Sequence, residues 1–118
     1  MPHVVIAGRV DLTRYARDFK ALVLRADGDV LRADALYLER SGRAALIEAL
    51  AVEAGRKLPF YVKISMHSER ATVRIDPLTH PERSEGVKRI VAAIGADLLR
   101  HTPGAQIEVT NLVLPSAD

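Results

Sequence analysis

The chain opens with Met1-Pro2-His3-Val4-Val5-Ile6-Ala7-Gly8-Arg9-Val10, and the alternation in this stretch predicts a buried strand over residues 3–10. Val4 and Ile6 share one face of that strand with Pro2, whereas Arg9 lies on the other face. Apolar residues at helical spacing follow Asp11, a typical N-cap, and predict a helix that ends at the turn over 26–29. A strand over 30–40 then completes one β-α-β unit.

Residues 43–54 are open to two interpretations. Their Ala, Leu and Glu content favours a helix between Ser41, as a cap, and Gly55, as the stop. Ser41-Gly42 is also typical of a hairpin turn, in which case the segment is a strand that forms a meander with its neighbours. The predicted fold class is the same for both.

The second half of the chain again ends in strand, helix and strand. Apolar residues alternate over 60–66 and 71–75 around a polar turn, which predicts a β-hairpin with one apolar face. Thr79-His80-Pro81-Glu82 has the pattern of a capping box, and the helix after it is predicted to stop near Pro103-Gly104. A last strand is predicted over 106–114, with Asn111 on its apolar face.

The expected fold is therefore one α+β domain over residues 1–118. Two β-α-β units would form a mixed sheet with helices on one face, as a ferredoxin-like sandwich or a pseudo-duplicated β-α-β fold. A small core and open strand edges favour self-association, so we expect a homo-oligomer.

Composition excludes several classes of function. The absence of cysteine rules out disulfides, thiolate metal sites and a cysteine nucleophile. The net charge is only +2 and basic residues are interleaved with acidic ones, so we expect no nucleic-acid partner. With no signal-like start and no apolar run long enough to span a bilayer, we expect a cytoplasmic protein without a membrane partner.

Pro2 is the best candidate for chemistry. Removal of Met1 would leave the Pro2 nitrogen as a terminal secondary amine at the start of a strand. Burial disfavours the charged form of such an amine and lowers its pKa, which suits it to acid/base catalysis. The structural alternative is a proline that merely starts an edge strand, where its missing N–H is harmless.

Met1-Pro2-His3-Val4-Val5-Ile6, followed by a helix and a strand, resembles the amino terminus of the tautomerase superfamily, particularly its 5-carboxymethyl-2-hydroxymuconate isomerase branch. The resemblance implies a tautomerase-like fold of β-α-β units, assembly as a trimer, and an amino-terminal proline that acts as an acid/base. It covers chiefly the first ten residues and the order of elements, because residues 41–76 insert additional secondary structure between the two units.

The preferred hypothesis is keto–enol proton transfer on a small carboxylate or enol acid. Pro2 would move the proton, while one or more of Arg9, Arg32 and Arg40 would bind the acid and stabilise the enolate. No cofactor or metal is implied, because the four histidines show no metal-ligand spacing. The rival is a non-enzymatic, ferredoxin-like binding or assembly module, so the sequence leaves open whether the protein is an enzyme.

Overall fold

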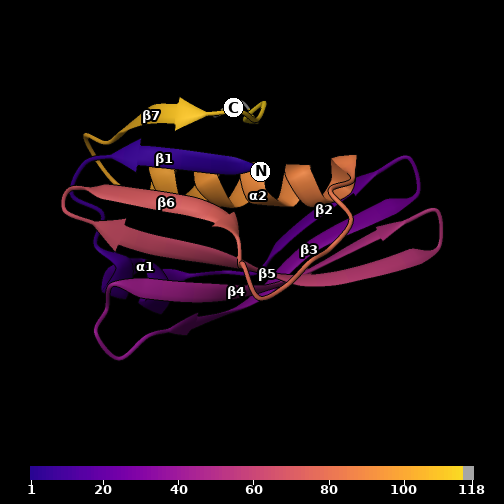
Figure 1. Cartoon of the computed structure of the whole chain (residues 1–118), viewed down its shortest axis with the longest axis horizontal. Coiled ribbons are helices and arrows are strands. Elements are labelled where there is room, and N and C mark those ends of the chain that lie inside the picture. Colours follow the sequence, from indigo (N-terminus) through magenta and orange to yellow (C-terminus); the bar gives the residue numbers. More distant parts are fainter. Residues whose placement is uncertain (116–118) are drawn as a thin grey trace.

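The structure, a computed structural model, describes residues 1–115, in which a strongly curled sheet forms a half-barrel around one long helix (Figure 1). The elements in chain order are β1 (His3–Ala7), α1 (Leu12–Asp18), β2 (Leu22–Ala26), β3 (Asp29–Leu38), β4 (Ala44–Glu53), β5 (Arg56–His67), β6 (Arg70–Ile75), α2 (Glu85–Arg100) and β7 (Gln106–Thr110). The strand order is β2-β3-β4-β5-β6-β1-β7, and each pair of neighbours is antiparallel.

The predicted fold class is wrong. A β-α-β unit joins parallel strands, but in the described part of the chain every strand pairing is antiparallel, so the sheet is not mixed. The strand before α1 also does not lie beside the strand after it. β1 pairs with β6 and β7, whereas β2 forms the opposite edge of the sheet. The protein is mostly β and has neither the tautomerase-like nor the ferredoxin-like arrangement of two β-α-β units.

Residues 43–54 belong to strand β4, so the strand interpretation of that segment is correct. Ala45, Ile47, Ala49 and Ala51 are buried at every second position, which is the period of a strand with one face on the core. The predicted hairpin over 60–75 is also confirmed, as β5 and β6. β5 begins earlier than predicted, at Arg56, because it continues the hairpin with β4.

The predicted helix over 12–26 is wrong in its second half. α1 ends at Asp18, and residues 22–26 form β2, which pairs with β3 through the two-residue turn Asp27-Gly28. Both turn residues have positive φ, 51° and 84°, as a type I′ hairpin turn requires. Asp27 and Gly28 therefore form the turn of a β-hairpin and do not end a helix.

The long helix α2 fills the concave face of the sheet and packs against β1, β3, β4 and β6 (Figure 1). Its approach to β1 is close, since a Cβ placed on Gly95 would lie 2.9 Å from Cγ2 of Val4. The helix starts later than predicted, with Ser84 as N-cap instead of Thr79, and His101 caps its other end. The strand predicted over 106–114 is confirmed for Gln106–Thr110 only, and Asn111 is exposed instead of lying on an apolar face.

Candidate functional site

Pro2 is buried at the start of β1, on the same face as Val4 and Ile6, as predicted. Met1 before it is 52% exposed, but its carbonyl is held by two side chains. The Asn111 amide donates to the Met1 oxygen over 2.7 Å, and Nδ1 of His3 lies 2.8 Å from the same oxygen. The Asn111 side chain also accepts the backbone N–H of His3 at 3.0 Å. Asn111 thus fixes the position of the first peptide bond.

Met1 lines a pocket of about 340 Å³, together with Ile75, Asp76, Pro77, Thr79, His80, Pro81 and Arg83. Most residues that line this pocket belong to the segment between β6 and α2. Because β6 pairs with β1, that segment begins next to the strand that Met1 precedes. Arg83 and His80 are exposed, and the Arg83 guanidinium has no ion-pair partner among residues 1–115. The Met1–Pro2 peptide therefore lies at the edge of a pocket that holds an available cation.

The three arginines predicted from the sequence do not meet Pro2. Arg9 follows the far end of β1 and forms an exposed ion pair with Glu69 at 3.8 Å. Arg32 is on β3, which three strands separate from β1, and pairs with Asp34 at 3.4 Å. Arg40 lies in the exposed turn between β3 and β4. None of the three lines the pocket beside Met1; the arginine that lines it is Arg83.

Asp76 is the buried carboxylate of this region, with only 7% of the residue exposed. Both backbone polar groups of Asp76 are hydrogen-bonded. Its N–H donates to the backbone carbonyl of Tyr61, and its carbonyl accepts both the N–H and the hydroxyl of Thr79. Within residues 1–115, however, the carboxylate has no hydrogen-bond or ion-pair partner in the protein. No fully enclosed side-chain oxygen is left unpartnered in that range, so the Asp76 carboxylate oxygens are accessible to solvent. Asp76 lines this pocket and a second one.

A second pocket of about 360 Å³ shares Asp76 with the first. Its walls are largely apolar and come from β3, β4, β5 and the segment after β6: Tyr37, Leu38, Ala44, Ala45, Leu46 and Leu78, with Glu39 and Lys63 as further polar residues. Leu78, at the wall of this pocket, is 88% exposed. Asp76 therefore lines both pockets, of which the second has the more apolar walls.

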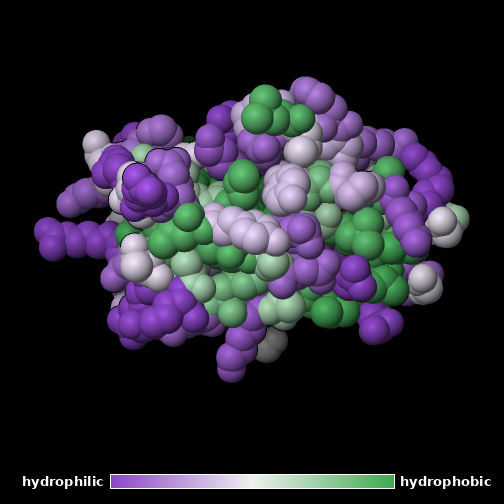
Figure 2. All heavy atoms as spheres, turned by 90° about the horizontal axis from the view of Figure 1, so that it is seen from below, coloured by the Kyte–Doolittle hydropathy of each residue, from purple (hydrophilic) through white to green (hydrophobic). Residues whose placement is uncertain are grey.

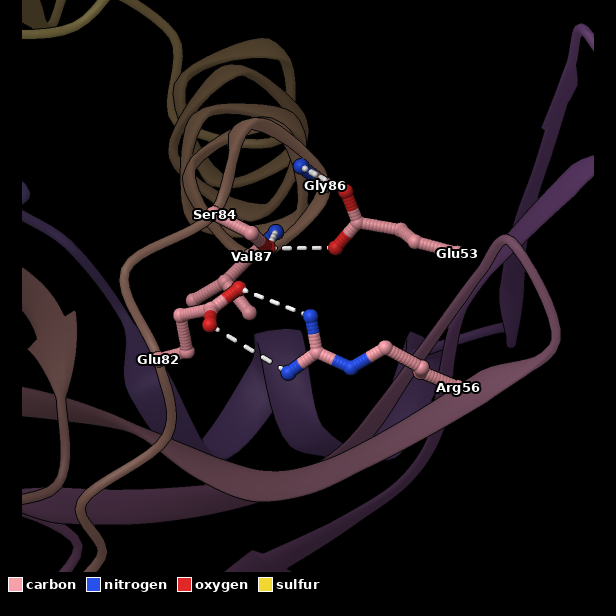
Figure 3. Close-up of polar contacts among 6 residues, drawn as sticks. All are labelled: Glu53, Arg56, Glu82, Ser84, Gly86 and Val87. Carbon is pink, nitrogen blue, oxygen red and sulfur yellow. Dashed lines mark hydrogen bonds and ion pairs between the residues drawn. The ribbon is translucent and has the colours of Figure 1, made fainter.

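The segment 76–84, which contributes residues to both pockets, is anchored at both ends, and Figure 3 shows the end beside α2. Thr79 bonds to the Asp76 carbonyl at 3.0 Å at one end. At the other end the Arg56 guanidinium faces the Glu82 carboxylate, with nitrogen–oxygen distances of 3.2 and 3.4 Å. Ser84 donates to the Glu53 carboxylate, which also accepts the Gly86 N–H at 3.2 Å. The pocket segment is thus tied to the β4–β5 hairpin and to the start of α2.

A third polar cluster joins α1 to the end of α2. The Tyr15 hydroxyl donates to the Asp97 carboxylate at 2.6 Å, and Arg100 bonds to the same carboxylate at 3.2 Å. Burial, and then the hydrogen bond and charge of Asp97, raise the pKa of Tyr15 far above its ordinary value, although Arg100 acts in the opposite direction. Because these bonds join α1 to the last turn of α2, we assign the cluster to the packing of the two helices.

Both edge strands of the sheet expose apolar side chains. Val23 and Leu24 on β2 and Val109 on β7 are among the most exposed large hydrophobic residues of the protein. The face seen from below relative to Figure 1 shows hydrophobic residues in two areas along its middle, with hydrophilic residues between and around them (Figure 2). This distribution leaves apolar surface outside the two pockets.

Sequence reasoning missed Arg83, His80 and Asp76 as site residues. His80 was placed in a helix cap, and Arg83 would have followed within that helix, whereas both lie in the irregular segment before α2. Pro77 and Pro81, close together between a strand and a helix, were the available signal for such a segment. Asp76 is the first residue after a predicted strand, a place where sequence alone does not show whether a carboxylate is buried.

Comparisons with protein-family models, with curated proteins and with solved structures gave no match to this chain. In the part of the chain that the structure describes, neither helix has the length and apolar character needed to cross a membrane.

Proposed function

We propose that the protein catalyses keto–enol proton transfer on a small enol acid bound in the pocket that Met1 lines. The observation that carries this proposal is the placement of Met1 beside Arg83 and His80 in one pocket of about 340 Å³. Removal of Met1 would take away the carbonyl held by Asn111 and His3 and expose the Pro2 nitrogen at the edge of that pocket. The proposed compartment is the cytoplasm.

The chemistry follows from the groups around this nitrogen. Pro2 is buried, and apolar surroundings make it easier for its ammonium form to release a proton. In ketonisation the Pro2 ammonium would donate a proton to carbon 3 of the enol acid, while the enol oxygen releases its proton to water and the Pro2 amine is then reprotonated from solvent. Arg83 would bind the carboxylate of the substrate, because a guanidinium matches a carboxylate with two parallel hydrogen bonds.

The test begins with the intact mass of the untagged protein, which should lack Met1. Ketonisation of phenylenolpyruvate should exceed the uncatalysed rate and should fall at least a hundredfold in Pro2→Gly, since a flexible primary amine replaces a fixed secondary one. Arg83→Ala should raise KM at least tenfold, because a charge-assisted hydrogen bond contributes about 1.5–3 kcal/mol. Circular dichroism should show the same fold in both variants.

Arg9→Ala and Arg40→Ala are matched controls, since both remove an exposed arginine that lies away from the pocket. They should retain the parent kinetics. Retained Met1, absence of catalysis by the parent protein, or an equal loss in all three arginine variants would contradict the proposal.

A second candidate is a non-enzymatic assembly module, and the exposed apolar residues of β2 and β7 favour it. Edge strands offer unpaired backbone groups as well as side chains, so a second copy could extend the sheet. The resemblance to tautomerases predicts a trimer. Sedimentation at micromolar concentration should then give a mass above that of the monomer, and Val23→Lys should reduce it; a monomer in both cases would argue against this function.

A further inference from the structure

We infer that the convex face of β5 and β6 binds a phosphate dianion, either free or as the monoester of a small molecule. The site consists of two cationic and two hydroxyl side chains: Lys63, Ser65, Thr72 and Arg74. None of the four lines the pocket beside Met1, so this inference does not depend on the proposed function.

The strand register places the four side chains next to one another. Lys63 lies directly opposite Arg74, and Ser65 lies directly opposite Thr72. Buried residues alternate with them along both strands, so all four lie on the convex face, away from α2. Opposite residues have Cβ atoms about 4.5–5.5 Å apart, and every second residue of a strand is about 6.7 Å along. The four side chains are therefore close enough to contact one tetrahedral anion.

The pairing of Lys63 with Arg74 is unlike that of the other strand cations. Among the paired residues of the described strands, it is the only case in which a lysine or arginine lies opposite another. The others either have a carboxylate partner (Arg32, Arg56 and Arg70) or lie opposite a valine (Arg25 and Lys57). Like charges in opposite positions repel, so an anion bound between them would stabilise the folded sheet.

The four side chains are available to a ligand. Within residues 1–115 neither cation forms an ion pair, and neither hydroxyl makes a hydrogen bond. All four residues are half-buried, and none of their polar atoms is fully enclosed. An anion from solution can therefore reach the donor atoms of the site.

The acidic residues at neighbouring strand positions lie on one side of the two cations. Glu48 lies opposite the residue two places before Lys63, and Asp76 lies two places after Arg74. Both positions are on the side away from the hydroxyls. Beyond the hydroxyls, the next pair on β5 and β6 is a histidine and an arginine, and on β1 Arg74 faces His3. An anion between the cations and the hydroxyls is thus separated from the two carboxylates.

Charge and geometry favour a phosphate group over a carboxylate. A phosphate monoester carries a charge of about −1.5 to −2 near pH 7 and has three acceptor oxygens, whereas a carboxylate has one charge and two oxygens. The Arg74 guanidinium can donate to two phosphate oxygens, while Lys63 supplies a second positive charge. Ser65 and Thr72 can donate their hydroxyl protons to the same group.

Calorimetry on the untagged chain at pH 8 and low salt tests this site with inorganic phosphate, glycerol 3-phosphate and acetate. We expect the better of the two phosphates to bind at least tenfold more tightly than acetate, and it identifies the source of the phosphate group. Amide shifts in a ¹⁵N-labelled sample should change in residues 62–66 and 71–75. Equal binding of phosphate and acetate, no binding of either phosphate, or shifts confined to residues 76–83 would overturn the inference.

Three variants separate a defined site from general surface charge. Arg74→Gln should weaken phosphate binding at least tenfold, and Thr72→Val, which removes the hydroxyl but keeps the shape of the side chain, at least threefold. Lys57→Gln is the matched control, because Lys57 lies on the same face of β5 and has no carboxylate partner in the described chain. It should bind phosphate as the parent does. An equal loss in Lys57→Gln and Arg74→Gln would refute the site.

Urea unfolding supplies a second measurement. About 10 mM glycerol 3-phosphate, compared with sodium chloride at the same ionic strength, should raise the midpoint of the parent and of Lys57→Gln, because a ligand that binds the folded state stabilises it. The midpoint of Arg74→Gln should not change. A rise of the same size in all three proteins would contradict binding between Lys63 and Arg74.

Discussion

Ser84→Ala should destabilise the protein by about 2 kcal/mol, because this one hydroxyl both caps α2 and bonds the start of that helix to the sheet. It accepts the Val87 N–H at 3.2 Å as the N-cap of α2, and it donates to the Glu53 carboxylate (Figure 3). Loss of an N-cap alone costs about 1 kcal/mol. The hydrogen bond to a partly buried carboxylate adds roughly another 1 kcal/mol, since Glu53 keeps the Gly86 N–H at 3.2 Å.

Ser41 provides a matched control. Its hydroxyl also donates to a glutamate, Glu39, at 2.7 Å and accepts a backbone N–H, that of Arg43, at 3.1 Å. It does so in an exposed turn without a helix, so Ser41→Ala should cost less than about 0.5 kcal/mol. Urea unfolding followed by circular dichroism at 222 nm gives both free energies. Equal losses in the two variants would refute the argument that α2 is capped from the β4–β5 hairpin.

The remaining predictions concern the core and the tyrosine cluster. Gly95→Ala should destabilise the protein by about 1–3 kcal/mol despite the better helix propensity of alanine, because its Cβ would meet the buried, β-branched Val4, and Val4→Ala in the same chain should recover part of the loss in urea unfolding. The raised pKa of Tyr15 means that the folded protein holds this proton more tightly than the unfolded chain does. The associated stability is therefore complete below about pH 10, the ordinary tyrosine value, and declines above it. Unfolding measured from pH 9 to 11 should show a steeper decline in the parent than in Tyr15→Phe, and parallel curves would contradict the assignment.

The strands with clear alternation and the hairpin over 60–75 could be predicted from the sequence, whereas other connections could not. Gly28 was interpreted as part of the turn that ends a helix, and Gly55 had the same role in the helical alternative for residues 43–54, because glycine favours positive φ after a helix. The same φ is required in a two-residue hairpin turn, and both glycines follow a residue with φ near 50° that completes such a turn. A local pattern does not distinguish these uses; pairing of β2 with β3 and of β4 with β5 decides between them.

The candidate site was predicted in part. Pro2 was placed on the buried face of β1, and an arginine was expected near it, but Arg83 could not be chosen over twelve other arginines. Its position depends on Arg56 and Glu53, which hold the pocket segment from a distant hairpin. Contacts between residues so far apart in the sequence produce no recognisable motif or residue spacing.

The position of β1 in the sheet has a consequence for the order in which the chain folds during synthesis. β1 leaves the ribosome first, yet its nearest partner in β6 is made about 70 residues later, a delay of roughly 4–14 s at ordinary elongation rates. Its other partner, β7, follows later still. Val4 and Ile6 must therefore remain exposed while β2 to β6 form successive hairpins between near neighbours. An unpaired apolar strand of this kind is a natural target for chaperones, and β1 can close the core only after β6 and β7 have been made.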